Sequence, residues 1–175
     1  MKACDAQMAF LLLIAILELA ALRASPPAEV RLGGLFPSFR TSGSVIIAGQ
    51  QRMAAFLMAV KEINANPHIL PNTTIKIAVR DTRLHAGKAF LATLDMVTNA
   101  FNKSGIDGCI GAATSAESDA ASDVLTQYST VQVSSSSASS TMSSRIDYPF
   151  FARTCPQDSF QGAAIADLVF NRYGW

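Results

Sequence analysis

Hydroxyl side chains are concentrated in residues 131–158, which read VQVSSSSASSTMSSRIDYPFFARTCPQD. Val131 and Val133 predict a short strand before the serine run, and a second apolar run ends at Arg153. In α/β proteins, small polar ligands bind where such strands end in polar loops. The stretch therefore predicts a binding loop, in which Ser134 to Ser137 supply hydroxyl and backbone N–H groups. A flexible serine-rich linker is the alternative.

Two residues elsewhere in the chain have side chains suited to an anionic ligand. Ser115 lies at or next to the start of a predicted helix, where free N–H groups and the helix dipole favour a carboxylate. Arg52 lies in the first turn of another predicted helix and could clamp a second anionic group. An ordinary helix cap and a solvated surface arginine are the alternatives. Glu117, Asp119 and Asp123 add negative charge nearby, which would equally favour a ligand with an amine.

Catalytic patterns are scarce in this chain. It contains no G-x-S-x-G elbow, no Walker A loop and no G-x-G-x-x-G fingerprint. His68 and His85 lie beside predicted turns and have no partner at metal-ligand spacing, so we expect no metal and no cofactor. Asp81 ends a predicted strand, where an aspartate more often caps the following turn than acts as an acid. The many serines leave a secreted serine hydrolase as the enzymatic alternative.

Length and composition indicate one domain with a substantial core. The chain has 175 residues, of which 50% are hydrophobic and 15% charged, and its formal net charge is +1. There is no basic stripe and no nucleic-acid-binding motif, so we expect no nucleic-acid partner.

The N-terminus has the features of a secretory signal peptide. Lys2 precedes the apolar segment Met8–Leu17, and small residues lead into Pro26 and Pro27. We therefore predict a signal peptide over residues 1–24, with an uncleaved membrane anchor as the alternative.

Secretion would give meaning to two glycosylation sequons and to the cysteines. Asn72 and Asn102 each begin an N-x-S/T sequon at a predicted element boundary. Outside the predicted signal peptide the cysteines are Cys109 and Cys155, both on predicted strands. They could pair, although buried free thiols are the commoner outcome in such positions.

Strand and helix patterns alternate along the chain. Apolar or β-branched runs predict strands over residues 30–36, 74–79, 108–110, 131–133 and 150–153. Helical periodicity predicts helices over residues 49–64, 86–101, 115–128 and 158–173, the third with a Thr114–Glu117 capping box. For the second helix, the expected buried face consists of Phe90, Leu91, Leu94, Val97 and Phe101. This order predicts a three-layer, Rossmann-like α/β fold with a parallel sheet, so all the candidate loops would lie at one sheet edge.

With these positions laid out, the chain resembles the extracellular Venus-flytrap module of family C G-protein-coupled receptors, and metabotropic glutamate receptors in particular. This module has the type I periplasmic-binding-protein fold. The resemblance covers nearly all of residues 29–175. The motifs that carry it are LGGLFP at 32–37, GQQRMAAFLMAVKEIN at 49–64, ILPNTTI at 69–75, RDT at 80–82, IGAATSAES at 110–118, VQVSSSSAS at 131–139, YPFFARTCPQD at 148–158 and the final YGW.

The resemblance implies a role for each candidate residue. Arg52 matches the arginine that binds the distal carboxylate of glutamate, and Ser115 matches the serine that holds the α-carboxylate. Ser136 and Ser137 match the first two positions of a Ser-x-Thr element that contacts the amino-acid head group. Ala138 stands where that element has threonine, so the hydroxyl contact to the α-amino group is in doubt.

Two departures from the family pattern stand out. The family's disulfide in this lobe would join the positions of Thr41 and Arg83, so both cysteines are missing together, and we expect loop 38–48 to be more mobile. The sequence also stops where the family's second lobe begins. We interpret residues 29–175 as lobe 1 of an incomplete ligand-binding module.

The function implied by the resemblance is amino-acid sensing, with glutamate as the leading ligand, at the extracellular face of the plasma membrane. The family would add a homodimer through lobe 1, with helices 49–64 and 115–128 as candidate faces, and a G protein bound by a transmembrane part. A receptor guanylyl cyclase ectodomain and a soluble solute-binding protein of the same fold are the alternatives among binding modules.

Overall fold

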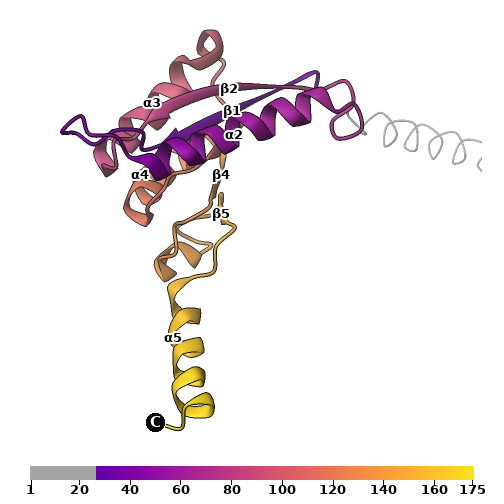
Figure 1. The fold of residues 1–175 in the computed structure, drawn as a ribbon. Helices are drawn as coiled ribbons and strands as arrows, with labels where there is room; N and C mark the ends of the chain where they lie inside the picture. The colour runs from indigo at the N-terminus through magenta and orange to yellow at the C-terminus, as the bar shows by residue number, and fades with distance from the viewer. Residues whose placement is uncertain (1–26) are drawn as a thin grey trace, which may run out of the picture.

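The computed structural model describes residues 27–175, so the predicted signal peptide lies outside the described residues. Five parallel strands form one sheet in the order β2-β1-β3-β4-β5 (Figure 1). The elements are β1 (Glu29–Phe36), α2 (Ile47–Ala65), β2 (Thr74–Asp81), α3 (Ala86–Lys103), β3 (Gly108–Ile110), α4 (Ser115–Gln127), β4 (Val131–Ser134), β5 (Phe151–Arg153) and α5 (Asp158–Asp167). A 3-10 turn (Ser140–Ser143) precedes β5, and a π-helical turn (Leu168–Arg172) extends α5. The predicted α/β fold with a parallel sheet is confirmed.

The strands end at one edge of the sheet. Phe36 of β1 is in register with Asp81 of β2, and Ser134 of β4 is in register with Arg153 of β5. In a parallel sheet the loops that follow such positions must meet at the same edge. The three candidate loops predicted from the sequence are therefore neighbours in the fold.

The two faces of the sheet have separate cores. Helices α3 and α4 cover one face, where the buried side chains are Leu35, Met96, Val97, Ala100, Ile106, Cys109, Ala112, Ala121, Val124 and Leu125. Helix α2 covers the other face, where only Phe36, Phe56, Val60 and Ile75 are buried and six further apolar residues are partly exposed. We call these the α3/α4 face and the α2 face.

The expected buried face of α3 is largely wrong. Phe90, Leu91 and Leu94 are 39%, 57% and 37% exposed. Val97 is buried as expected, and the other buried positions of this helix are Ala89, Thr93, Met96 and Ala100. Small side chains here let α3 pack closely against the sheet and α4, so the large residues point outward.

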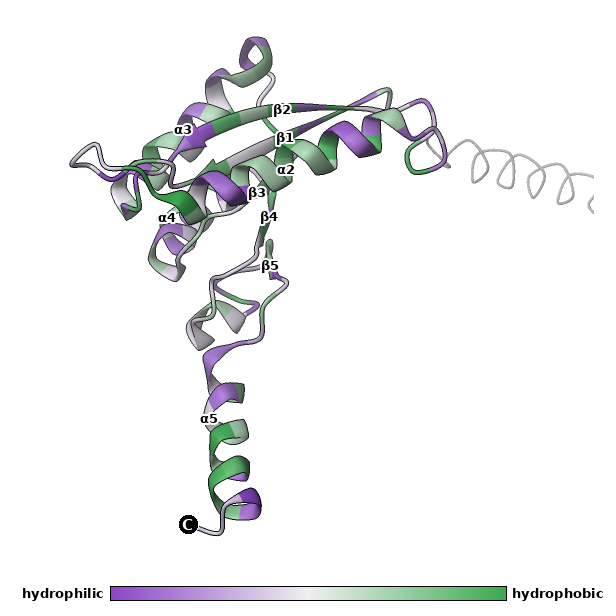
Figure 2. Cartoon of the chain, viewed as in Figure 1, coloured by the Kyte–Doolittle hydropathy of each residue, from purple (hydrophilic) through white to green (hydrophobic). Residues whose placement is uncertain are grey.

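Helix α5 extends away from the sheet in Figure 1. Figure 2 shows that the helix itself carries apolar residues, in green, as well as polar ones. None of its residues is buried, and Phe160 and Ile165 are both at least 60% exposed. The prediction placed one helix over residues 158–173. The structure has an α-helix to Asp167 followed by the π-helical turn.

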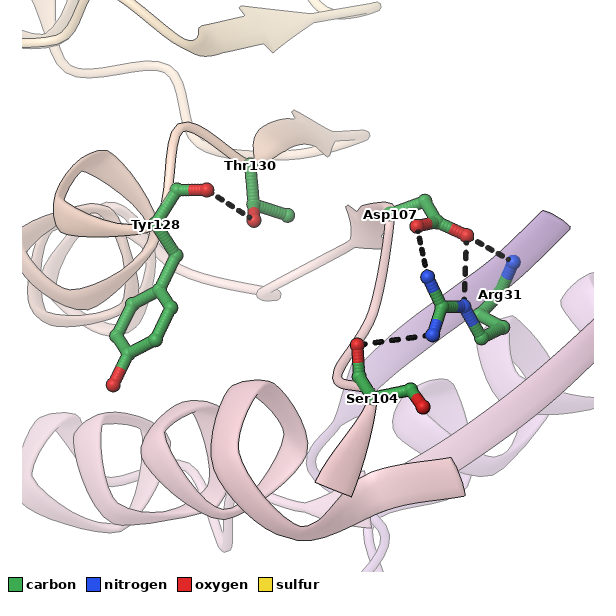
Figure 3. A network of polar contacts seen from close by, with 5 residues as sticks. All are labelled: Arg31, Ser104, Asp107, Tyr128 and Thr130. Carbon is green, nitrogen blue, oxygen red and sulfur yellow. Dashed lines mark hydrogen bonds and ion pairs between the residues drawn. The ribbon is translucent and has the colours of Figure 1, made fainter. Parts of the chain in front are cut away.

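An ion pair links the start of β1 to the residue before β3, at the end of the sheet away from the candidate loops (Figure 3). The Arg31 guanidinium donates to both carboxylate oxygens of Asp107, at 2.7 and 3.1 Å, and to the Ser104 carbonyl oxygen at 2.9 Å. The hydrogen bonds from Arg31 are the largest cause of a lowered pKa for the Asp107 carboxyl.

The two cysteines differ in environment and are not bonded to each other. Cys109 lies in β3 and is 1% exposed, and burial raises the pKa of its thiol to about 12. The prediction for Cys155 is wrong, because this residue follows the end of β5 and is partly exposed. Within residues 27–175, no helix combines the length and apolar character needed to cross a membrane.

Candidate ligand-binding site

Residues Ser134–Ser139, here called the serine loop, are held in place by buried hydroxyl groups. The Ser134 hydroxyl donates to the Ala112 carbonyl oxygen at 2.9 Å and accepts the Ser137 backbone N–H at 3.1 Å. The Ser137 hydroxyl lies 2.8 Å from that of Ser134 and 2.7 Å from that of Ser118 in α4. Because these groups are buried and satisfied, they fix the backbone of the loop rather than leaving it a free linker.

Arg153 holds the same loop from the side of β5. One terminal nitrogen of its guanidinium donates to the carbonyl oxygens of Ser137, at 3.1 Å, and Ser139, at 2.7 Å. The Asp158 backbone N–H donates to the Ala138 carbonyl oxygen at 2.9 Å. The start of α5 and the end of β5 therefore both anchor the loop.

The start of α4 is fixed by its capping residues. The Thr114 hydroxyl accepts the Glu117 backbone N–H, so the predicted N-cap at Thr114 is confirmed. The Glu117 carboxylate accepts from the Thr114 hydroxyl at 2.7 Å rather than from the Thr114 backbone N–H, as a full capping box would require. Glu117 is 1% exposed and also accepts from the Thr82 hydroxyl. Its carboxyl group is thus enclosed inside the fold, between the loop after β2 and the first turn of α4. The Asp81 carboxylate accepts the backbone N–H groups of Ser38 and Arg83, as expected for a turn-capping residue.

Ser115 and Ser136 retain hydrogen-bonding capacity on this scaffold. Ser115 is the first residue of α4, and its oxygen accepts the Ser139 N–H at 3.1 Å while its O–H has no acceptor within residues 27–175. Ser136 donates to the Ala113 carbonyl oxygen at 2.8 Å, which leaves lone pairs on its oxygen. The first hydroxyl is therefore free to donate to a carboxylate, and the second is free to accept from an ammonium group.

Arg52 is positioned by the close approach of α2 to the end of β1. A Cβ at Gly49 would lie 1.7 Å from the Pro37 carbonyl oxygen, so glycine is required for this packing. The Arg52 guanidinium forms no hydrogen bond or ion pair within the described part of the chain. It lines a cavity of about 480 Å³ together with Ser135. The other lining residues are apolar: Leu32, Phe36, Ala55, Phe56, Ala59, Val60, Ile63, Ile75 and Ile110.

The structure places the remaining candidates less favourably. Ser137 is fully buried and its hydroxyl is bonded inside the fold, so a ligand contact by that hydroxyl finds no support here. Ala138 is partly exposed and offers only a methyl group. The neighbouring Ser139 hydroxyl lies 2.7 Å from that of Thr141. Ser135 is exposed, and its hydroxyl makes no hydrogen bond within residues 27–175, so this loop has a hydroxyl that is free for a ligand.

No catalytic arrangement accompanies these serines in residues 27–175. The ring of His85 accepts the Gly87 N–H at the start of α3, and neither histidine is bonded to a serine hydroxyl. No group of three or more His, Cys, Asp or Glu side chains is placed to hold a metal ion in this part of the chain.

Residues 51–175 match the sequence model of a protein family described as the receptor family ligand binding region. The chain belongs to this family. It is 30% identical to a metabotropic glutamate receptor of Drosophila melanogaster over 86% of its length. It is 28% identical to human metabotropic glutamate receptor 8 over 84%, and 30% identical to the human extracellular calcium-sensing receptor over 87%. These relatives are family C receptors, so the family predicted from the motifs is confirmed.

The matched region is 17–19% of the length of these relatives, so the chain spans less than a fifth of each. What is established for the chain is therefore the family of its ligand-binding region and the fold of that region. The relatives carry names that refer to two different ligands, glutamate and calcium, so the family does not fix the ligand.

The sequence did not predict three structural features of this candidate site. From the sequence, Arg153 was assigned only as the last residue of a strand. A positively charged side chain at the end of a strand can donate to the carbonyl oxygens of a neighbouring loop and so hold that loop in place, as Arg153 does here. The burial of Glu117 had no sequence signal, because its capping role is compatible with an exposed side chain. Ser135 was indistinguishable from its neighbours in the serine run, and only its location beside Arg52 separates it.

Proposed function

We propose that this receptor ligand-binding region binds the head group of an amino acid between the start of α4 and the serine loop. The observation that carries the proposal is the opposite hydrogen-bonding capacity of two neighbouring hydroxyls. Ser115 can donate and Ser136 can accept, which is what a carboxylate and an ammonium group on one carbon require. The unpaired N–H groups at the start of α4 add positive potential for the carboxylate.

The proposed ligand is an amino acid with an acidic side chain, glutamate being the leading candidate. Arg52 is partly buried and has no partner within residues 27–175, so an acidic side chain would supply its missing counter-ion. The contact would lie beside Ser135, at the polar end of an otherwise apolar cavity. An amino acid with a neutral side chain would leave Arg52 unpaired.

A comparison of glutamate with glutamine tests this assignment. Both ligands are titrated into the full chain and into Arg52→Ala, with affinity measured from chemical shifts of backbone amides. The parent should bind glutamate about tenfold more tightly than glutamine, and Arg52→Ala should bind the two equally. Equal affinities in the parent would contradict the role of Arg52. Absence of binding by either amino acid would contradict the head-group site itself.

Two substitutions separate the head-group contacts. Ser115→Ala and Ser136→Ala should each weaken glutamate and glutamine by the same factor, since both ligands share the head group. Ser140→Ala, at an exposed serine outside the loop, is the matched control and should leave both affinities unchanged.

At the level of the whole receptor, we propose a homodimer at the extracellular face of the plasma membrane that signals through a G protein. Helices α2 and α4 were the expected dimer faces. The exposed apolar side chains of α3 make it a third candidate, because Leu91 is 57% exposed; on α2, which covers the opposite face of the sheet, Met58 is 71% exposed. Leu91→Glu and Met58→Glu, compared by sedimentation equilibrium, would show which face associates. A dimer unchanged by either substitution would exclude both helices.

Glycosylation at Asn72 and Asn102 is part of the same proposal. Both side chains are exposed, and both residues have a positive φ, of 64° at Asn72 in the turn before β2 and 57° at Asn102 in the last turn of α3. Enzymatic deglycosylation of secreted chain, with Asn72→Gln and Asn102→Gln as separate variants, should reveal one glycan lost per substitution. An unchanged mass for either variant would remove that site.

A further inference from the structure

A second, smaller cavity lies beside β5, at the edge of the sheet. Its volume is about 190 Å³, and its lining residues are Met142, Ser143, Arg145, Phe151, Ala152 and Arg153. A water molecule occupies about 30 Å³ in the liquid, so the cavity has room for a compact polyatomic ion with some water. Two of its six lining residues are arginines, so two guanidinium groups share one small space.

Neither arginine is neutralised by the protein. Within residues 27–175, the ion pairs involve Arg31, Lys76 and Arg80 and their acidic partners. Arg153 donates only to neutral acceptors, namely two backbone carbonyls, the Ser143 hydroxyl and the Gln157 side-chain oxygen. Arg145 donates one N–H to the Phe151 carbonyl oxygen at 2.7 Å. A guanidinium has five N–H groups, so four on Arg145 have no partner in the described part of the chain.

The nearby acidic residues are engaged elsewhere. The Asp147 carboxylate accepts from the Ser144 hydroxyl at 2.6 Å, and the Asp158 carboxylate accepts from the Gln161 amide at 3.2 Å. Neither lies within ion-pair distance of Arg145 or Arg153. Two like charges that share one cavity repel each other unless a counter-ion lies between them.

We infer that Arg145 and Arg153 form a binding site for a compact oxyanion such as phosphate or sulfate. Guanidinium groups bind such anions through pairs of parallel N–H donors, which Arg145 has available. Arg153 contributes its charge, because all four N–H groups of its terminal nitrogens are already directed to protein acceptors. Arg153 also anchors the serine loop, whereas Arg145 has no part in the proposed amino-acid site, so the test of this inference uses substitutions of Arg145.

Titration of the full chain with inorganic phosphate at constant ionic strength tests the inference, with binding followed by calorimetry. We expect saturable binding to the parent. Arg145→Gln should weaken it by at least about tenfold, the scale of losing a charge-assisted contact. Arg145→Lys keeps the positive charge but loses the paired N–H donors of the guanidinium, so its affinity for phosphate should lie between those of the parent and Arg145→Gln. Lys61→Gln, which removes one exposed positive charge on α2, is the matched control and should bind as the parent does.

The inference is overturned if phosphate does not bind in a saturable manner. It is also overturned if Arg145→Gln binds as well as the parent, or if Lys61→Gln weakens binding as much as Arg145→Gln does, because the effect is then that of net charge alone. Sodium sulfate should reproduce the phosphate result, and sodium chloride at equal ionic strength should not. Arg145 is exposed, so its substitution should leave the fold intact. If Arg145→Gln does not fold, the test is the phosphate affinity of Arg145→Lys, and an affinity equal to that of the parent overturns the inference.

Discussion

The two faces of the sheet differ in how completely their side chains are satisfied. On the α3/α4 face, ten apolar residues are buried, and the polar groups that enter it, such as Glu117 and Ser137, all have partners. On the α2 face, four apolar residues are buried, a cavity of about 480 Å³ remains, and Arg52 has no partner within residues 27–175. Tight packing and unfilled space therefore lie on opposite faces of the sheet: the α3/α4 face holds most of the buried core, and the α2 face has a cavity and an arginine without a partner in the described residues.

The largest expected effect comes from shortening a leucine on each face. Leu125 on the α3/α4 face is 1% exposed, whereas Leu32 lines the cavity on the α2 face and is partly exposed. Leu125→Ala should lower the free energy of unfolding by about 3–4 kcal/mol, and Leu32→Ala by about 1–2 kcal/mol, because the second site already has space and water access. Urea denaturation measures both. Equal losses would show that the two faces are packed alike.

The polar groups of the two faces provide the next test. Glu117→Ala should cost about 2–3 kcal/mol of unfolding free energy, because the hydroxyls of Thr82 and Thr114 would lose their acceptor inside the fold. Arg52→Ala should cost no more than about 0.5 kcal/mol, because no bond within the described residues is lost. A large loss for Arg52→Ala would mean that this arginine serves stability rather than binding.

A smaller effect is expected at Tyr148, which joins the loop before β5 to α4. Its hydroxyl donates to the Asp119 carboxylate at 2.5 Å, and this hydrogen bond, with burial as a lesser cause, raises the pKa of Tyr148 to about 12. Because the pKa is higher in the folded state, the stabilisation is complete below about pH 10 and is lost as the pH rises toward 12. Tyr148→Phe should therefore lower stability by about 1 kcal/mol at neutral pH and flatten its fall between pH 10 and 12.

Tyr128 provides the control for alkaline effects unrelated to this hydrogen bond. It is 49% exposed, and its hydroxyl makes no hydrogen bond within residues 27–175. Tyr128→Phe should keep the alkaline profile of the parent. If it flattens the profile as Tyr148→Phe does, the contact with Asp119 is not the cause.

The smallest effect is expected at the ion pair of Arg31 and Asp107, which lies at the end of the sheet opposite to the candidate site. The pKa of Asp107 is lowered, so its stabilising contribution is present above the unfolded pKa near 4 and is lost as the pH falls further. Asp107→Asn should lower stability at neutral pH by less than about 1 kcal/mol and reduce its acid dependence, since the pair is exposed. Arg31→Gln should produce the same change, and the double variant should add little. Additive losses would indicate that the two side chains act separately.

The sequence was sufficient to predict a parallel sheet and the edge of that sheet at which the candidate loops meet. Alternating apolar periods and turn residues are local signals, and parallel pairing follows from strands that alternate with helices. The buried side of α3 could not be derived in this way. Its large residues form a helical stripe as regular as the buried one, and the choice depends on close packing against α4, which is a tertiary property.

The candidate site was predictable to the level of loops but not of individual hydroxyls. Ser136 and Ser137 are adjacent and chemically identical, yet one is partly exposed and the other is fully buried in contact with Ser118. That distinction depends on how the serine loop packs against α4. Only the structure therefore separates the serines that hold the loop in place from the serines whose hydroxyl groups can still form hydrogen bonds with a ligand.

The most direct test of the proposed site is to map which backbone amides respond to glutamate. In the full chain with uniform nitrogen-15 labelling, glutamate should shift the amide signals of Ser115, Ser136 and the first turn of α2 around Arg52, and leave those around Arg31 and Asp107 unchanged. Ser115→Ala should abolish the shifts at the start of α4. Shifts confined to other parts of the molecule, or unchanged in Ser115→Ala, would contradict the proposal that the serine loop and the start of α4 form the amino-acid site.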